Sequence, residues 1–175
     1  LKGLDLLVEA FIILHKTDKI PPETQLDIAG TTLPDDQKFI DEQITKLDSA
    51  GLGQKYRIRQ NISREEKIAH LRGLTVLSVP VRYPEAFGLY TIEAMAAGVP
   101  IVQPNHGAFP EIIEHTGGGA TYNSNNPEAL ADALKPWLND PELSYQTGIH
   151  AHHAIKSKYS IKKHAEQILK VCFTE

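Results

Sequence analysis

The sequence predicts an α/β fold in which a parallel β-sheet carries helices on both faces. Short apolar stretches alternate with amphipathic ones along the 175 residues, and this order is typical of such sheets. The stretches Leu74 to Val79 and Val99 to Gln103 are rich in apolar residues, as expected of strands buried on both faces. No linker or internal repeat divides the chain, so we expect residues 1–175 to form a single domain.

The first half of the chain is expected to hold three helices and two short strands. Ser63 and Glu66 form a capping-box pattern, which predicts that a helix begins directly after Ser63. We expect the helices at residues 4–14, 34–47 and 64–72, and the strands at 24–30 and 55–60. Because a parallel sheet that opens on a helix is unusual, we expect the sequence to be a fragment whose first strand is missing.

The second half continues the alternation and then becomes helical. Gly98 is a natural stop for one helix, and Ser160 is a natural cap for the last one. We expect strands at 74–79, 99–103 and 120–122, and helices at 88–97, 108–115, 127–138, 141–158 and 161–172.

Composition excludes several classes of protein. The net charge of −4 and the pI of about 6.1 provide no basic field for nucleic acid. No apolar run approaches the roughly 20 residues that a transmembrane helix needs. The single Cys172 excludes an intramolecular disulfide framework and is compatible with a reducing compartment. We therefore expect a cytoplasmic protein.

The loop and helix between Val79 and Pro100 carry the most informative chemistry. A helix that begins near Gly88 leaves amide N–H groups unpaired, and its dipole favours an anion such as a diphosphate. The loop brings Glu85 to the same end of the sheet, and Glu93 lies one turn into the helix. Carboxylates are strong acceptors for sugar hydroxyls. The alternative is that both glutamates only stabilise the helix dipole.

This string resembles the donor-site signature of retaining glycosyltransferases of the GT-B fold, family 4, also called group 1 glycosyl transferases. The signature reads Glu-x-Phe-Gly-Leu-x-x-x-Glu-Ala-Met-Ala-x-Gly-x-Pro, and the chain matches it from Glu85 to Pro100. The segments Lys2 to Phe11 and Asn105 to Ile113 are also similar to segments of that family, in the same order. The resemblance covers nearly the whole chain.

The resemblance implies a role for each matching residue. Lys2 would neutralise the donor diphosphate, with the amides of Leu89 and Tyr90 on its phosphate oxygens. Glu93 would bind the ribose, and the loop at Asn61 and Ile62 would pack against the base. Glu85 would be the catalytic residue that positions the transferred sugar. The implied donor-binding residues are Lys2, Asn61, Ile62, Ala86, Phe87, Gly88, Leu89, Tyr90 and Glu93.

The family also implies an architecture and a reaction. The chain would be the Rossmann-like, donor-binding half of a GT-B enzyme of the hexosyltransferase type, inactive when isolated. Its partner would be its own N-terminal domain, which carries the acceptor site and could attach the protein peripherally to a membrane. The nucleotide-diphosphate sugar would be a substrate, with no cofactor and no metal.

Two other functions stay open. One is a nucleotide-sugar epimerase of the GT-B fold, and the other is a non-catalytic nucleotide-binding α/β module. A metal site is an alternative for His150, His152 and His153, but no cysteine or acid completes a ligand set there, so we expect a solvated helix face. His106 precedes a glycine turn, and we expect it to be structural.

Overall fold

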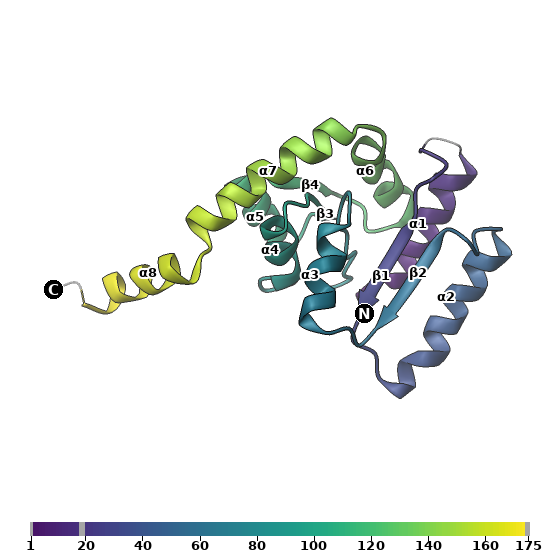
Figure 1. Cartoon of the computed structure of the whole chain (residues 1–175), viewed down its shortest axis with the longest axis horizontal. Helices are drawn as coiled ribbons and strands as arrows, with labels where there is room; N and C mark the ends of the chain where they lie inside the picture. The colour runs from purple at the N-terminus through teal and green to yellow at the C-terminus, as the bar shows by residue number, and fades with distance from the viewer. Residues whose placement is uncertain (1, 18–19, 174–175) are drawn as a thin grey trace.

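The computed structural model describes residues 2–17 and 20–173 and has the predicted α/β character (Figure 1). Its strands form two parallel pairs. Strand β1 (Leu26–Gly30) pairs with β2 (Tyr56–Gln60), and β3 (Ile101–Pro104) pairs with β4 (Gly119–Tyr122).

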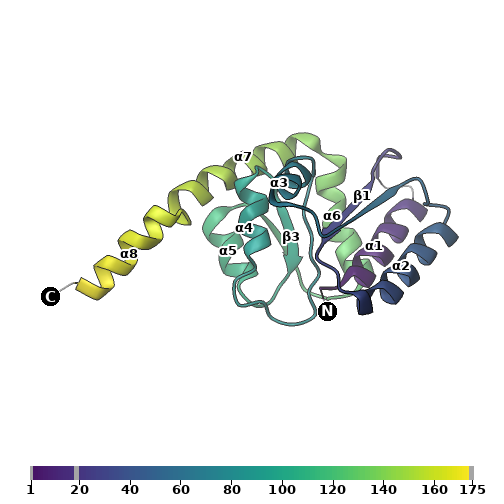
Figure 2. The ribbon, with the colours of Figure 1, turned by 60° about the horizontal axis from the view of Figure 1, so that its bottom comes forward.

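Helices surround these strands and follow the predicted order. They are α1 (Leu4–Lys16), α2 (Gln37–Ser49), α3 (Arg64–Arg72), α4 (Leu89–Ala96), α5 (Phe109–Thr116), α6 (Pro127–Asn139), α7 (Pro141–Lys158) and α8 (Ile161–Phe173). A 3-10 turn, Pro34–Asp36, precedes α2. Helix α8 projects from the end of α7, away from the body of the molecule, in Figures 1 and 2.

Local capping explains where helix α3 begins. Ser63 Oγ accepts a hydrogen bond from the Glu66 N–H at 3.2 Å, and the Glu66 carboxylate accepts one from the Ser63 N–H at 2.7 Å. This reciprocal pair is the predicted capping box of α3, and it satisfies two amide donors that the helix itself leaves unpaired. It also lowers the pKa of Glu66, mainly through the backbone hydrogen bond at Ser63.

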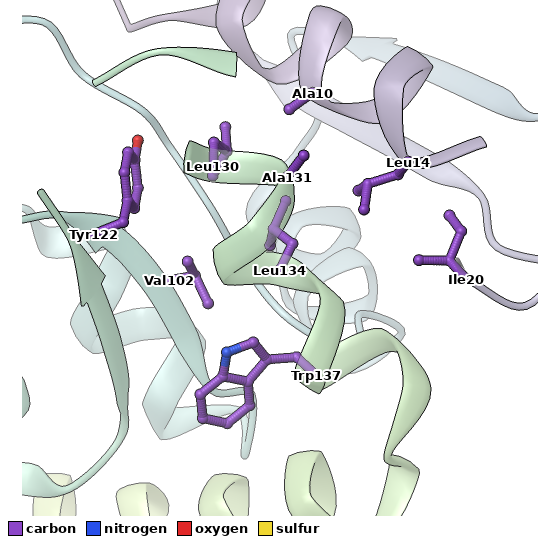
Figure 3. Close-up of a cluster of buried hydrophobic side chains, with 9 residues drawn as sticks. All are labelled: Ala10, Leu14, Ile20, Val102, Tyr122, Leu130, Ala131, Leu134 and Trp137. Atoms are coloured by element: carbon purple, nitrogen blue, oxygen red, sulfur yellow. The ribbon is translucent and has the colours of Figure 1, made fainter. Parts of the chain in front are cut away.

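Helices cover the second strand pair from both sides. In Figure 2, β3 lies between α4 and α5 on one side and α1 and α6 on the other. Ile101 packs with Met95 and Ile112, whereas its neighbour Val102 packs against α1 and α6. This alternation follows from the period of two along a strand. Figure 3 shows the second of these clusters, which consists of Ala10, Leu14, Ile20, Val102, Tyr122, Leu130, Ala131, Leu134 and Trp137.

The expected strand at residues 74–79 is wrong in its extent. Only Leu77 forms a bridge, to Ile101, through the hydrogen bonds from Leu77 N–H to Pro100 O and from Val102 N–H to Leu77 O, both 2.9 Å. Val79 N–H donates instead to the side-chain oxygen of Gln103. A segment that pairs along one edge makes about half of the backbone hydrogen bonds of a central strand. Apolar composition alone therefore does not make this segment a regular strand.

Among the described residues, no helix is both long and apolar enough to cross a membrane.

Candidate functional site

Backbone contacts fix the loop that precedes α4. Gly88 caps the helix with a left-handed φ of 73°, and a Cβ at this position would lie 2.8 Å from the Phe109 ring. Gly107 has φ 61°, and a Cβ there would lie 2.6 Å from Glu85 N and 2.5 Å from Glu85 O. The Ala108 N–H also donates to Glu85 O at 3.0 Å. Glycine is therefore required at two points that place Glu85.

The Glu85 carboxylate has two partners. Its Oε2 accepts hydrogen bonds from Lys2 Nζ at 2.7 Å and from the Tyr90 hydroxyl at 3.1 Å. Lys2 Nζ also lies 5.3 Å from the centre of the Tyr90 ring. The hydrogen bond and charge of Lys2 lower the pKa of Glu85, with a smaller effect from Tyr90. Burial and the neighbouring Glu85 charge raise the pKa of Tyr90, so Tyr90 is a hydrogen-bond donor at neutral pH.

The N-terminus of α4 faces this cluster with free amides. Gly88 offers no side chain to cap the helix, and Gly88 O is the acceptor for both Thr91 N–H and Thr91 Oγ1. Within the described part of the chain, the N–H groups of Leu89 and Tyr90 have no acceptor. A lysine and two free amides thus lie around one carboxylate, which is an arrangement suited to a ligand with both phosphate and hydroxyl groups.

Glu93 lies one turn further along α4 and is paired with a residue that the sequence did not indicate. Its Oε1 accepts a hydrogen bond from Lys67 Nζ of α3 at 2.7 Å, and both side chains are about two-fifths exposed. The pairing of α3 with α4 is a tertiary contact, so no local pattern could have predicted it.

Asn61 ties the ends of β1 and β2 together. It adopts φ 53°, and its side-chain oxygen accepts a hydrogen bond from Thr32 N–H at 3.0 Å. Its own N–H donates to Gly30 O. Asn61 and the adjacent Ile62 therefore follow the carboxyl end of β2, which is the end of a parallel sheet where ligands bind.

The remaining predicted residues are not drawn together by side-chain contacts. Ala86 and Phe87 are exposed, and the Phe87 ring lies 6.4 Å from that of Tyr159 at the end of α7. Phe87 lines a cavity of about 930 Å³ together with residues of α5, α7 and α8. Phe87 itself lies two residues after Glu85.

A further ion pair lies near Lys2, and the sequence did not indicate it. Arg82, in the loop before Glu85, bonds to Asp5 in the first turn of α1. This pair joins the same two segments as Lys2 and Glu85. Asp5 is three residues after Lys2, and Arg82 is three residues before Glu85. It helps to hold the start of α1 against the loop.

Two of the singled-out histidines contact backbone carbonyls. His152 Nδ1 lies 2.6 Å from Ala96 O, and the His106 Nε2 lies 3.2 Å from Val81 O. No group of three His, Cys, Asp or Glu residues in the described ranges is arranged to hold a metal ion.

Comparison with known proteins places the chain in one family. Residues 1–154 match the family described as "Glycosyl transferases group 1". The chain is 29% identical over 169 residues to the lipopolysaccharide core biosynthesis mannosyltransferase LpcC of Rhizobium leguminosarum bv. viciae, which covers 95% of this chain and 46% of that protein. It is 33% identical over 98 residues to the D-inositol 3-phosphate glycosyltransferase of Streptomyces avermitilis, covering 56% of this chain and 21% of that protein. The chain thus spans less than half of the length of these two relatives.

Solved structures share the fold. The C-terminal domain of a group 1 family glycosyl transferase (LpcC) from Francisella tularensis has a TM-score of 0.77 at 27% identity, covering 91% of this chain and 80% of that one. The Anabaena protein Alr3699/HepE, solved in complex with UDP and glucose, has a TM-score of 0.82 at 20% identity, covering 98% of this chain and 44% of that one. From the match over residues 1–154, we conclude that the chain belongs to the group 1 glycosyl transferases.

Proposed function

We propose that the chain is the donor-binding half of an enzyme that moves a hexosyl unit from a nucleoside diphosphate sugar to an acceptor hydroxyl with retention of anomeric configuration. The observation that carries the proposal is the cluster of Lys2, Glu85 and the free amides at the start of α4. It provides positive charge for a diphosphate directly beside a carboxylate for a sugar.

Each residue has a defined part in this proposal. Lys2 and the amides of Leu89 and Tyr90 bind the diphosphate. Glu85 binds the transferred sugar, with the backbone of residues 86–88 around it. Glu93 accepts hydrogen bonds from the ribose, because its Oε2 is left free by Lys67. The loop at Asn61 and Ile62 packs against the base at the end of β2.

The same groups act on the reaction. When the bond between the anomeric carbon and the diphosphate oxygen breaks, the electron pair leaves with the diphosphate. The acceptor oxygen bonds to the anomeric carbon, and the proton of the acceptor hydroxyl passes to the departing diphosphate oxygen. Negative charge grows on the leaving diphosphate, where the Lys2 ammonium and the helix amides stabilise it. We propose that these groups perform this role without a metal ion or other cofactor.

The second half of the enzyme completes the site. The Anabaena protein solved with UDP and glucose is more than twice the length of this chain. We propose that an N-terminal domain supplies the acceptor site, and that the isolated 175-residue chain binds donor but transfers no sugar. The enzyme is expected to work in the cytoplasm.

One assay of the longer enzyme tests this function. The enzyme is incubated with UDP-glucose, UDP-N-acetylglucosamine or GDP-mannose and candidate acceptors, and the product is followed by NMR of its anomeric proton. We expect acceptor-dependent release of nucleoside diphosphate and a product with the donor's anomeric configuration. Inversion would contradict retention, and conversion of the donor into an epimeric nucleotide sugar without net release of nucleoside diphosphate would favour an epimerase. Binding without turnover of any donor would favour a non-catalytic module.

A further inference from the structure

The carbonyl oxygen of Val81 accepts hydrogen bonds from two side chains. His106 Nε2 lies 3.2 Å from this oxygen, and Asn125 Nδ2 lies 2.9 Å from it. His106 follows β3 and Asn125 follows β4, so the two donors come from different loops at the carboxyl edge of the second strand pair. A carbonyl oxygen has two lone pairs, and two donors satisfy it fully.

These two side chains replace a strand ladder that ends before Val81. Among the described residues, Leu77 is the last one before α4 with backbone-to-backbone hydrogen bonds on the β3 side. Beyond it, the Val79 N–H donates to a side chain of β3, and the Val81 N–H turns back to Val79 O at 2.8 Å. Val81 is 3% exposed, and a buried backbone carbonyl needs a partner. Within the described ranges, His106 and Asn125 supply it.

The turn that contains His106 also holds Glu85. Gly107 and Ala108 follow His106 directly, and a Cβ on Gly107 would lie 2.6 Å from Glu85 N. The Ala108 N–H donates to Glu85 O at 3.0 Å. One turn therefore grips the loop before α4 at two points, at Val81 through the imidazole and at Glu85 through the backbone. Three residues separate these points, so a shift at Val81 reaches Glu85.

The imidazole of His106 serves this contact as a neutral donor. Because a carbonyl oxygen can only accept, Nε2 carries a proton. His106 Nδ1 is buried and makes no hydrogen bond within the described part of the chain. A second proton on Nδ1 would be a buried N–H without an acceptor, which is unfavourable. A neutral N–H group of similar reach is therefore sufficient at this position, and glutamine provides one.

We propose that His106 and Asn125 are positioning residues for the sugar transfer. They hold the Val81 carbonyl, and the loop of residues 81–85 in turn keeps the Glu85 carboxylate in place. Neither side chain contacts the sugar or the diphosphate, and both act through Glu85. The proposal rests on the proposed function of Glu85, but the effect of the two side chains on Glu85 can be measured without sugar transfer.

Two pairs of variants of the longer enzyme test the proposal. His106→Leu removes one donor, whereas His106→Gln keeps a neutral N–H near the position of Nε2. Asn125→Asp removes the donor to Val81 and keeps the acceptor of the Tyr122 hydroxyl. Asn105→Asp is the matched control, because the same change is made at the same edge of the sheet, but the Asn105 amide donates to the loop after β4 and not to Val81.

Amide hydrogen exchange at Ala108 reports whether Glu85 is held, and exchange at Leu26, which bonds within the first strand pair, is the reference. We expect His106→Leu and Asn125→Asp to speed exchange at Ala108 at least about tenfold and to leave Leu26 unchanged. The same two variants should lower kcat at least about tenfold, because a displaced reacting group slows the reaction. Affinity for UDP, measured by calorimetry, should stay the same. His106→Gln and Asn105→Asp should behave as the wild type does.

The other outcomes overturn the proposal or assign the failure elsewhere. Wild-type kcat in His106→Leu and Asn125→Asp would overturn it, whether or not exchange at Ala108 changes. A fall in UDP affinity that equals the fall in kcat, or faster exchange at Leu26 and Ala108 alike, would show a purely structural role. If His106→Leu does not fold, Asn125→Asp and its control decide. If the wild-type enzyme transfers no sugar, the proposed function fails, and exchange at Ala108 alone decides whether the two side chains hold Glu85.

Discussion

The two glutamates near the start of α4 form ion pairs of equal length but in different surroundings. Glu85 and Glu93 each lie 2.7 Å from a lysine Nζ. The Glu85 side chain is 25% exposed, and Tyr90 and the Gly107 backbone also hold this residue. The Glu93 side chain is 42% exposed, and Lys67 is its one side-chain partner in the described part of the chain.

The difference in surroundings indicates that the Glu85 carboxylate is held in place and that the Glu93 carboxylate can move. Exposed ion pairs contribute only about 0–1 kcal/mol to stability, so the Lys67–Glu93 pair can rearrange around a ligand at little cost. The backbone of Glu85 is held at Gly107 and Ala108, and its carboxylate cannot move without losing the hydrogen bonds from Lys2 and Tyr90. This suits Glu85 to a reacting sugar, whose geometry must be held closely, and Glu93 to the ribose.

The largest effect is expected from Gly107→Ala, which moves Glu85. The new Cβ would overlap the Glu85 backbone, and a displacement of about 1 Å at a reacting group can reduce the rate about 100-fold. Gly51→Ala is the matched control, because Gly51 has a similar φ of 77° and nothing within 4 Å of a Cβ.

We expect each alanine variant to lose about 1–2 kcal/mol of stability from the left-handed backbone. Gly107→Ala should lose more than this, because its Cβ also overlaps the Glu85 backbone, and only Gly107→Ala should lose activity. The two variants are compared by thermal unfolding and by kcat in the longer enzyme. Equal activity of Gly107→Ala and Gly51→Ala would show that the position of Glu85 is unimportant.

Glu85→Gln keeps the shape of the side chain and removes its charge. Hydrogen bonds to a charged group contribute about 1.5–3 kcal/mol, so we expect kcat to fall about 10- to 100-fold. Affinity for the nucleoside diphosphate should stay the same or increase, because Lys2 loses its competing partner. Steady-state kinetics and calorimetry with UDP measure the two effects. A fall in affinity that equals the fall in kcat would argue against a role on the sugar.

Glu93→Gln should show the opposite behaviour. The same loss of about 1.5–3 kcal/mol would weaken nucleoside diphosphate binding about 10- to 100-fold and appear mainly in KM. Lys67→Met is the control, since it removes the partner but keeps the Glu93 charge; we expect affinity to change less than about threefold, as for an exposed pair. If Glu93 only stabilises the helix dipole, Glu93→Gln would lower stability by about 0.3–1 kcal/mol and leave binding unchanged.

The smallest effect concerns the titration of Glu85. Because Lys2 lowers the pKa of Glu85, the pair stabilises the fold at pH values above the unfolded pKa of a glutamate, and this contribution is lost as the pH falls through the lowered folded pKa. We expect Lys2→Met to raise the Glu85 pKa, as measured by NMR of its side-chain carboxyl carbon. An unchanged titration would mean that the ion pair does not form in solution.

Local signals predicted much of the fold. The Ser63 and Glu66 pattern placed the start of α3, and the Gly98 stop placed the end of α4 to within two residues. The prediction for segment 74–79 was wrong in extent because strand formation depends on neighbours that are distant in sequence, and among the described residues one of its edges has none.

The candidate site was predictable in its residues but not in its contacts. The motif from Glu85 to Pro100 identified both glutamates, and the segment at Lys2 identified the lysine. The sequence did not show that Lys2 bonds directly to Glu85, that the Tyr90 hydroxyl joins them, or that Lys67 holds Glu93. These contacts join α1, the loop before α4, and α3, so they depend on tertiary packing.

The central claim is that a diphosphate binds at the start of α4, and amide NMR tests it most directly. The ¹⁵N-labelled protein is titrated with UDP while the amides of Leu89 and Tyr90 are followed, with those of Asp41 and Glu42 on α2 as a reference. The account predicts that the Leu89 and Tyr90 resonances shift with a single saturable binding curve, and that the two α2 amides do not move. Saturable binding that leaves Leu89 and Tyr90 unshifted would contradict it.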